Sequence, residues 1–135
     1  MSRPDGDGRL DGERYDEGMA IRREVLSDAH VDRAVDGTTG FTADFQDFIT
    51  RVAWGDVWAR PGLQRRERSI AVLSSLIALG HHEEFAMHVR AAVRNGLTRD
   101  EIREVILQSA VYAGVPAANT AFRIADGVLA GLDDE

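Results

Sequence analysis

The sequence predicts an all-α protein, and three observations support that prediction. Apolar residues recur at helical spacing along most of the chain. No segment shows the sustained alternation of apolar and polar residues that is typical of a strand. Glycine and proline clusters interrupt the pattern at intervals of about one helix length. With 135 residues, the chain is long enough to bury a core of its own.

The N-terminal part is predicted to contain a tail and two helices. Residues 1–12 are rich in glycine and charge and have almost nothing to bury, so we expect a flexible tail, followed by a single domain over residues 13–135. Apolar residues between Met19 and Leu26 indicate a first helix that starts near Glu13. A short helix is expected from Asp28 to Val35, before two glycines and two threonines break the chain.

The segment from Thr42 to Ala59 is predicted to be one amphipathic helix that faces the core. Its apolar residues recur at spacings near 3.6: Phe45, Phe48, Ile49, Val52 and Val57. The sequence Arg60-Pro61-Gly62 is expected to end this helix.

The C-terminal half predicts four further helices. The first two run from Gln64 to Leu79 and from about His82 to Asn95, and a glycine suited to the C′ position follows each of them. Thr98 and Glu101 then form a capping box, with Leu97 and Ile102 placed as a hydrophobic staple, so a helix begins there and continues to Gly114. Pro116 suits the first position of a last helix that ends at about Leu132.

Composition excludes several kinds of chemistry. Cysteine is absent and all 16 basic residues are arginine, which excludes disulfides, thiolate ligands, cysteine nucleophiles and lysine Schiff bases. The net charge of −7 argues against a protein that coats nucleic acid or an anionic membrane. The longest strongly apolar stretch, Ile70 to Leu79, is too short to span a bilayer, and the N-terminus lacks the apolar region of a secretory signal. We therefore expect a cytoplasmic protein.

Residues 81–88 gather three of the four histidines and two carboxylates. On a helix, Glu84 and His88 lie one turn apart, where the carboxylate can orient the imidazole and favour its protonated form. Alternatively, these are solvated turn residues and a simple surface pair. His81, Glu84 and His88 could also share a metal ion, but their spacing fits no standard ligand motif, so no metal is predicted.

Four arginines gather around the start of the helix predicted from Gln64: Arg60, Arg65, Arg66 and Arg68. Arginine side chains and the N-terminus of a helix both favour anions. The four arginines either hold an anion or form ordinary surface ion pairs.

Other residues could shape a pocket. Trp54 and Trp58, one turn apart, either wall a flat pocket or belong to the core. Gln108 and Tyr112 are polar groups on an apolar helix, and they either lock the core or face a ligand.

The order of the motifs resembles the carboxymuconolactone decarboxylase family. The resemblance rests on FTADFQDFITRVAWGDVWARPGL from Phe41, RRERSI from Arg65, EEFAMHVRAA from Glu83, NGLTRDEIREV from Asn95 and QSAVYAGVPAAN from Gln108. It extends from about Tyr15 to Leu129, and its W-G-x-V-W-x-R-P-G-L segment is specific to the decarboxylases.

The wider superfamily is that of the alkylhydroperoxidase D proteins, whose redox motif is C-x-x-C followed by a histidine. Aligned with this motif, His81 and Glu84 occupy the cysteine positions and His88 the histidine position. The superfamily's proton-relay glutamate falls at Ser69. The resemblance therefore implies a pocket beside His88 but no peroxidase activity.

The family resemblance implies a compact bundle of about six helices that assembles into a homo-oligomer, commonly a hexamer. It implies cofactor-free decarboxylation of a small anionic lactone, 4-carboxymuconolactone, to the 3-oxoadipate enol-lactone in the protocatechuate branch of the β-ketoadipate pathway. On this hypothesis His88, oriented by Glu84, donates the proton, with His81 as a competing acid. A clamp for the retained carboxylate would come from Arg65 and Arg68.

In the same hypothesis Trp54, Gln108 and Tyr112 shape or polarise the pocket, and the alanine-rich last helix permits close packing at an interface. Two other hypotheses remain open: a family member acting on a different lactone or keto acid, and a non-catalytic helical oligomer that binds a small anion.

Overall fold

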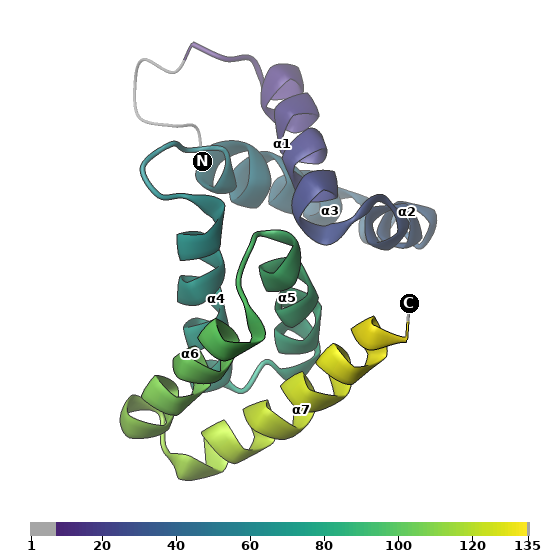
Figure 1. Ribbon diagram of the computed structural model, residues 1–135. Coiled ribbons are helices and arrows are strands. Elements are labelled where there is room, and N and C mark those ends of the chain that lie inside the picture. Colours follow the sequence, from purple (N-terminus) through teal and green to yellow (C-terminus); the bar gives the residue numbers. More distant parts are fainter. Residues whose placement is uncertain (1–7, 135) are drawn as a thin grey trace. The chain divides into compact units, whose positions relative to one another are not determined.

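A computed structural model describes residues 8–134, and all regular secondary structure in this part of the chain is helical (Figure 1). The prediction of an all-α fold is therefore confirmed. The elements are α1 (Asp11–Leu26), α2 (Asp28–Asp36), α3 (Ala43–Ile49), the π-helix η1 (Thr50–Trp58), α4 (Arg65–Leu79), α5 (His82–Arg94), α6 (Arg99–Tyr112) and α7 (Val115–Asp133). They divide into two compact units, residues 1–63 and 64–135, which are described separately.

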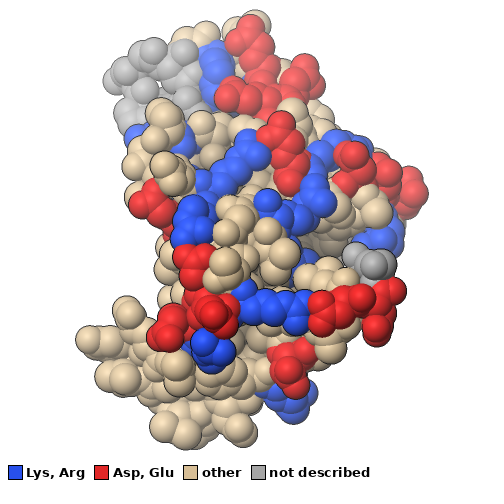
Figure 2. Space-filling model, viewed as in Figure 1, with Lys and Arg blue, Asp and Glu red and all other residues tan. Residues whose placement is uncertain are grey.

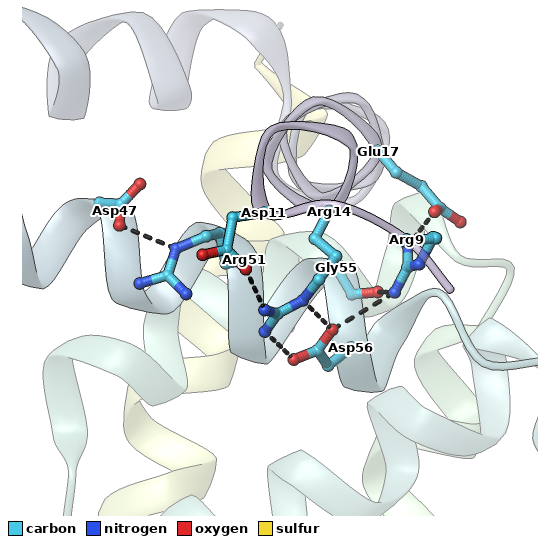
Figure 3. Close-up of polar contacts among 8 residues, drawn as sticks. All are labelled: Arg9, Asp11, Arg14, Glu17, Asp47, Arg51, Gly55 and Asp56. Carbon is cyan, nitrogen blue, oxygen red and sulfur yellow. Dashed lines mark hydrogen bonds and ion pairs between the residues drawn. The ribbon is translucent and has the colours of Figure 1, made fainter. Parts of the chain in front are cut away.

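Ordered contacts in the N-terminal unit begin earlier than the sequence predicts. Helix α1 starts at Asp11, and Arg9, ahead of it, donates a hydrogen bond of 2.9 Å to the carbonyl oxygen of Gly55 and pairs with Glu17 (Figure 3). The segment from residue 8 to residue 12 is thus attached to η1, in contrast to the expected tail. Residues 1–7 of that expected tail lie outside the described part.

Helix α1 and η1 meet at two glycines. A Cβ atom on Gly18 would lie 2.0 Å from the carbonyl oxygen of Thr50 and 2.8 Å from the nitrogen of Gly55. A Cβ atom on Gly55 would lie 2.4 Å from the carbonyl oxygen of Arg14. The two backbones therefore touch directly, and a side chain at either position would force them apart.

Substituting Gly18 with alanine is expected to destabilise the protein by about 1–3 kcal/mol or more, because the added methyl group collides with rigid backbone rather than with a flexible side chain. Urea unfolding of both variants measures this, with Gly12→Ala as the matched control. Gly12 lies in the same helix, and a Cβ atom there meets nothing within 4 Å. Equal stability of the two variants would contradict the close contact.

The predicted core-facing helix from Thr42 to Ala59 is helical throughout most of its length, but its predicted orientation is wrong. Phe45, Phe48 and Val57 are exposed, by 61%, 48% and 46%, and the buried residues of η1 are Thr50, Trp54, Gly55 and Asp56. For Val57 one physical reason is that the segment after Ile49 is a π-helix, whose wider turn shifts the buried face away from positions spaced at 3.6 residues. Phe45 and Phe48 lie before it on α3, which buries none of its residues.

The C-terminal unit has a conventional apolar core built by all four of its helices. It includes Leu73 and Ile77 from α4, Phe85 and Val89 from α5, Ile102 and Ile106 from α6, and three alanines from α7. Here the local signals of the sequence are confirmed. Gly80 and Gly96 follow α4 and α5 with positive φ angles of 73° and 96°. The Thr98 hydroxyl accepts a hydrogen bond from the backbone N–H of Glu101, and the Glu101 carboxylate accepts one from the backbone N–H of Thr98. The staple residues Leu97 and Ile102 are buried.

The small residues of α7 are used inside this unit. Ala118, Ala121 and Ala125 are each at most 4% exposed and belong to the apolar core, with Ala117 packed against it. The predicted role of this stripe at an interface between subunits is therefore corrected, because its surface is already occupied within the chain. None of the helices in residues 8–134 is both long and apolar enough to cross a membrane.

Candidate functional site

The histidine and glutamate residues singled out by the sequence lie on α5 and at its start. His81 precedes the helix at the N-cap position and is exposed, as is Glu84 in the first turn. His88, one turn after Glu84, is only 7% exposed. The structure thus distinguishes the two candidate acids, since His88 is removed from bulk water and His81 is not.

A partly buried hydrogen bond joins α4 to the end of α5. The side-chain amide of Asn95, at the end of α5, donates to the hydroxyl oxygen of Ser69 at 2.8 Å, and Ser69 is fully buried. His88 lies seven residues before Asn95, which corresponds to about 10 Å along the helix axis. Ser69 is therefore occupied in holding the two helices together.

The arginine cluster separates into different kinds of contact. Arg66 donates to the carbonyl oxygen of Gly96 at 2.9 Å and pairs with Glu101, so it joins the start of α4 to the start of α6. Arg65 and Arg68 are half-buried on the first turns of α4. Arg66 is therefore structural, whereas Arg65 and Arg68 remain the candidates for binding an anion.

The Arg66 guanidinium holds the pKa of Glu101 at about 2, below its ordinary value of 4.5. Because the pKa is lower in the folded state, this pair stabilises the fold above pH 4.5 and loses its contribution as the pH falls toward 2.

We expect Glu101→Gln, which retains an oxygen for the capping box, to flatten the loss of stability across that pH window. Urea unfolding as a function of pH measures it. Glu104→Gln, an exposed neighbour on α6, should leave the slope as in the unmodified protein, and two identical slopes would contradict the assignment.

Gln108 and Tyr112 lie on the same side of α6 and are both exposed, Tyr112 by 86%. They line an open groove of about 330 Å³ between α4 and α6, together with Ser74, Ser75 and Ala78. The structure thus decides against a role in locking the core. It brings these two residues together, but His88 is not part of this groove.

Trp54 belongs to the N-terminal unit, whereas the other predicted site residues belong to the C-terminal unit. Trp54 is 6% exposed. The centroids of the Trp54 and Trp58 rings are 5.1 Å apart, and the angle between the ring planes is 33°. Within its own unit Trp54 is a core residue.

As for metals, no group of three or more His, Cys, Asp or Glu side chains within residues 8–134 is arranged to hold an ion.

One polar residue that the sequence analysis did not single out is Arg22. It is 5% exposed and lies on the buried face of α1, in the series Arg14, Gly18, Arg22 and Val25. The spacing of four, four and three residues was the available signal, because it places two arginines on a stripe that otherwise faces the interior.

The comparisons with known proteins agree with the resemblance found in the sequence. The profile of the carboxymuconolactone decarboxylase family matches residues 43–127. The chain belongs to this family. Among its relatives, the 4-carboxymuconolactone decarboxylase of Acinetobacter baylyi is 47% identical over 122 residues, covering 90% of this chain and 91% of the relative.

Two further relatives extend the comparison. The nitrosuccinic acid decarboxylase npaB of Metarhizium robertsii is 39% identical over 121 residues, covering 90% of this chain and 85% of the relative. The 4-carboxymuconolactone decarboxylase of Pseudomonas putida is 54% identical over 44 residues, covering 33% of this chain and 92% of that sequence. The chain is thus similar to relatives named for two different acids.

Proposed function

We propose that this protein decarboxylates 4-carboxymuconolactone to the 3-oxoadipate enol-lactone, without a cofactor, as a cytoplasmic enzyme of the protocatechuate branch of the β-ketoadipate pathway. The observation that carries the proposal is the 47% identity, over nine-tenths of both chains, to the enzyme of that name from Acinetobacter baylyi.

The chemistry of this substrate is compatible with the residues available. One carboxylate is attached to the γ-carbon of an α,β-unsaturated lactone carbonyl. When its bond to the ring breaks, CO2 leaves and the electron pair moves through the double bond to the carbonyl oxygen. A proton then adds to the ring α-carbon. Because the substrate is its own electron sink, the protein has only to hold the retained carboxylate, stabilise the oxyanion and deliver the proton.

His88 is the proposed proton donor, with Glu84 as the residue that orients it and His81 as the competing acid. The burial of His88 supports this order, because a proton donor shielded from water keeps its proton directed at the substrate. Arg65 and Arg68 are proposed to hold the retained carboxylate.

Three further residues are proposed to shape the pocket. Gln108 and Tyr112 already share a groove, which supports their role as neutral hydrogen-bonding groups. For Trp54, a buried residue of the N-terminal unit, the proposal is that its indole contacts substrate. Its test is a Trp54→Phe variant, which should raise KM if that contact exists.

We expect Arg65→Ala and Arg68→Ala to raise KM by about 10-fold or more, because a charge-assisted hydrogen bond to a carboxylate is worth about 1.5–3 kcal/mol. Steady-state kinetics measure this. Arg90→Ala is the matched control, since Arg90 is exposed on α5 and its removal changes the net charge equally. Three equal values of KM would show that the carboxylate is held elsewhere.

A second candidate substrate is nitrosuccinic acid, favoured by the 39% identity to the enzyme named for it. Both acids carry two carboxylates and an electron sink, a nitro group or a conjugated carbonyl, that accepts the electrons released with CO2. The values of kcat/KM for the two substrates distinguish the candidates. A value for nitrosuccinate that exceeds the value for carboxymuconolactone would overturn the first proposal.

We also propose that the protein is a homo-oligomer, with a hexamer as the expected state. Exposed apolar side chains support self-association: Phe41, Phe45 and Phe48 in the N-terminal unit, and Val111, Tyr112 and Val115 in the C-terminal unit. Figure 2 shows an extended face without charged side chains where α6 ends and α7 begins. Sedimentation at several concentrations tests this, and a monomer at assay concentration would contradict it.

A further inference from the structure

Arg22 is a buried cation without a carboxylate partner among the described residues. Its two terminal nitrogens donate to neutral oxygens, one to the hydroxyl of Thr50 and the other to the side-chain carbonyl of Gln46, both at 3.2 Å. Its Nε atom is fully buried and has no hydrogen-bond acceptor in the described structure. In contrast, the other buried arginine of α1, Arg14, is paired with two aspartates.

A buried guanidinium in this state is unfavourable by itself. Removing a cation from water costs several kcal/mol unless an opposite charge compensates it. Burial accordingly lowers the pKa of Arg22 below its ordinary value. The phenol of Tyr15 acts in the opposite direction, but its effect is smaller than that of burial. The surroundings of Arg22 are therefore suited to an anion that the protein itself does not supply.

Arg22 lies at an open groove of about 700 Å³ that is formed entirely within the N-terminal unit. This volume is in the range that small-molecule sites occupy. Apolar side chains of Met19, Val35 and Ala43 line it, alongside the polar side chains of Tyr15 and Thr38. The groove thus combines an apolar wall, neutral hydrogen-bonding groups and one buried positive charge.

The carboxylates of the groove do not neutralise Arg22. Asp11 pairs with Arg14 and Asp47 pairs with Arg51, as Figure 3 shows. The third, Asp16, is exposed. The positive charge of Arg22 is therefore left for a ligand.

We propose that this groove is a binding site for a small free carboxylate, held by the guanidinium of Arg22. The ligand oxygens would accept from the remaining N–H groups of the two terminal nitrogens of Arg22, in the paired geometry that arginine offers to carboxylates. The site stands on the N-terminal unit alone, so it goes beyond the proposed decarboxylation and does not depend on it.

Titration of the full-length protein with succinate tests the proposal, because binding is measured without turnover. Succinate should shift the amide resonances of Tyr15, Gln46 and Thr50 in a saturable manner at constant ionic strength. Succinamide, which has the same shape without charge, should not. Arg22→Gln should weaken succinate binding at least 10-fold, whereas Arg33→Gln, the loss of an exposed arginine on α2, should not change it.

A second pair of variants keeps Arg22 in place, in case Arg22→Gln fails to fold. Ala43 is exposed and lines the groove, so Ala43→Glu adds a competing carboxylate at the start of α3, and Ala43→Gln adds the same bulk without charge. The glutamate should weaken succinate binding and the glutamine should not. Three results would overturn the proposal. The two Ala43 variants could bind succinate equally well, or succinamide could cause the same shifts as succinate. Succinate could also bind only after an oligomer dissociates.

Discussion

Replacing His88 with glutamine is expected to lower kcat by about 10²- to 10⁴-fold, the usual contribution of a positioned proton donor. Glutamine can still donate a hydrogen bond, but it cannot give up a proton to the ring carbon. KM should change little, because the retained carboxylate is held by other residues. Steady-state kinetics on the purified variant measure both constants.

Two comparisons separate this role from a structural one. His81→Gln should retain most of kcat, because His81 is exposed ahead of α5, and Glu84→Gln should lose less than His88→Gln. The circular dichroism spectrum and the oligomer size of all three variants should match those of the unmodified protein. A His88→Gln enzyme with near-normal kcat would contradict the assignment and leave His81 as the leading candidate. A His88→Gln chain that does not fold would show that His88 is structural.

Replacing Asp56 with asparagine is expected to destabilise the protein by about 3–5 kcal/mol, the usual cost of removing one partner of a buried ion pair. Its carboxylate accepts from Nε of Arg14 at 2.9 Å and from a terminal nitrogen of the same side chain, as well as from Arg9 at 3.3 Å (Figure 3). Arg14 and Asp56 are 4% and 7% exposed. With asparagine in place, the charge of Arg14 stays buried and loses its main counter-ion.

Urea unfolding provides the measurement. Asp36→Asn is the control, because Asp36 is exposed at the end of α2, where removing a negative charge is neutral or slightly favourable. A destabilisation of Asp56→Asn below about 1 kcal/mol, the range of exposed ion pairs, would show that the contact between α1 and η1 does not depend on this pair.

Signals that act within a few residues of the chain were predicted well. The capping box of Thr98 and Glu101 and the positive φ of Gly80 depend on local backbone geometry, which the sequence specifies directly. Pro116 was also placed in the first turn of the last helix, although that helix begins one residue earlier than expected, at Val115.

Features that depend on what lies opposite a residue were predicted less well. The apolar pattern of Phe45 and Phe48 identifies a helix face, but not whether the same chain covers it. The direct contact of Gly18 with Gly55 joins residues 37 positions apart. The sequence around either glycine does not distinguish a glycine at a helix contact from a glycine that ends a helix.

For the candidate site, the residue types could be predicted and their environments could not. The sequence groups Arg66 with Arg60, Arg65 and Arg68, and only the contact of Arg66 with Glu101 shows that Arg66 is structural. Arg22 was overlooked because an arginine on a helix is ordinarily solvated, and its burial becomes visible only when α3 and η1 are in place.

The most direct test of the proposed activity is to incubate chelator-treated protein with 4-carboxymuconolactone and to measure released CO2 and the enol-lactone product together. The proposal predicts equal amounts of the two, formed at the same rate before and after exhaustive removal of metal ions. Absence of product from a folded protein, or activity that returns only when a metal ion is added, would contradict it.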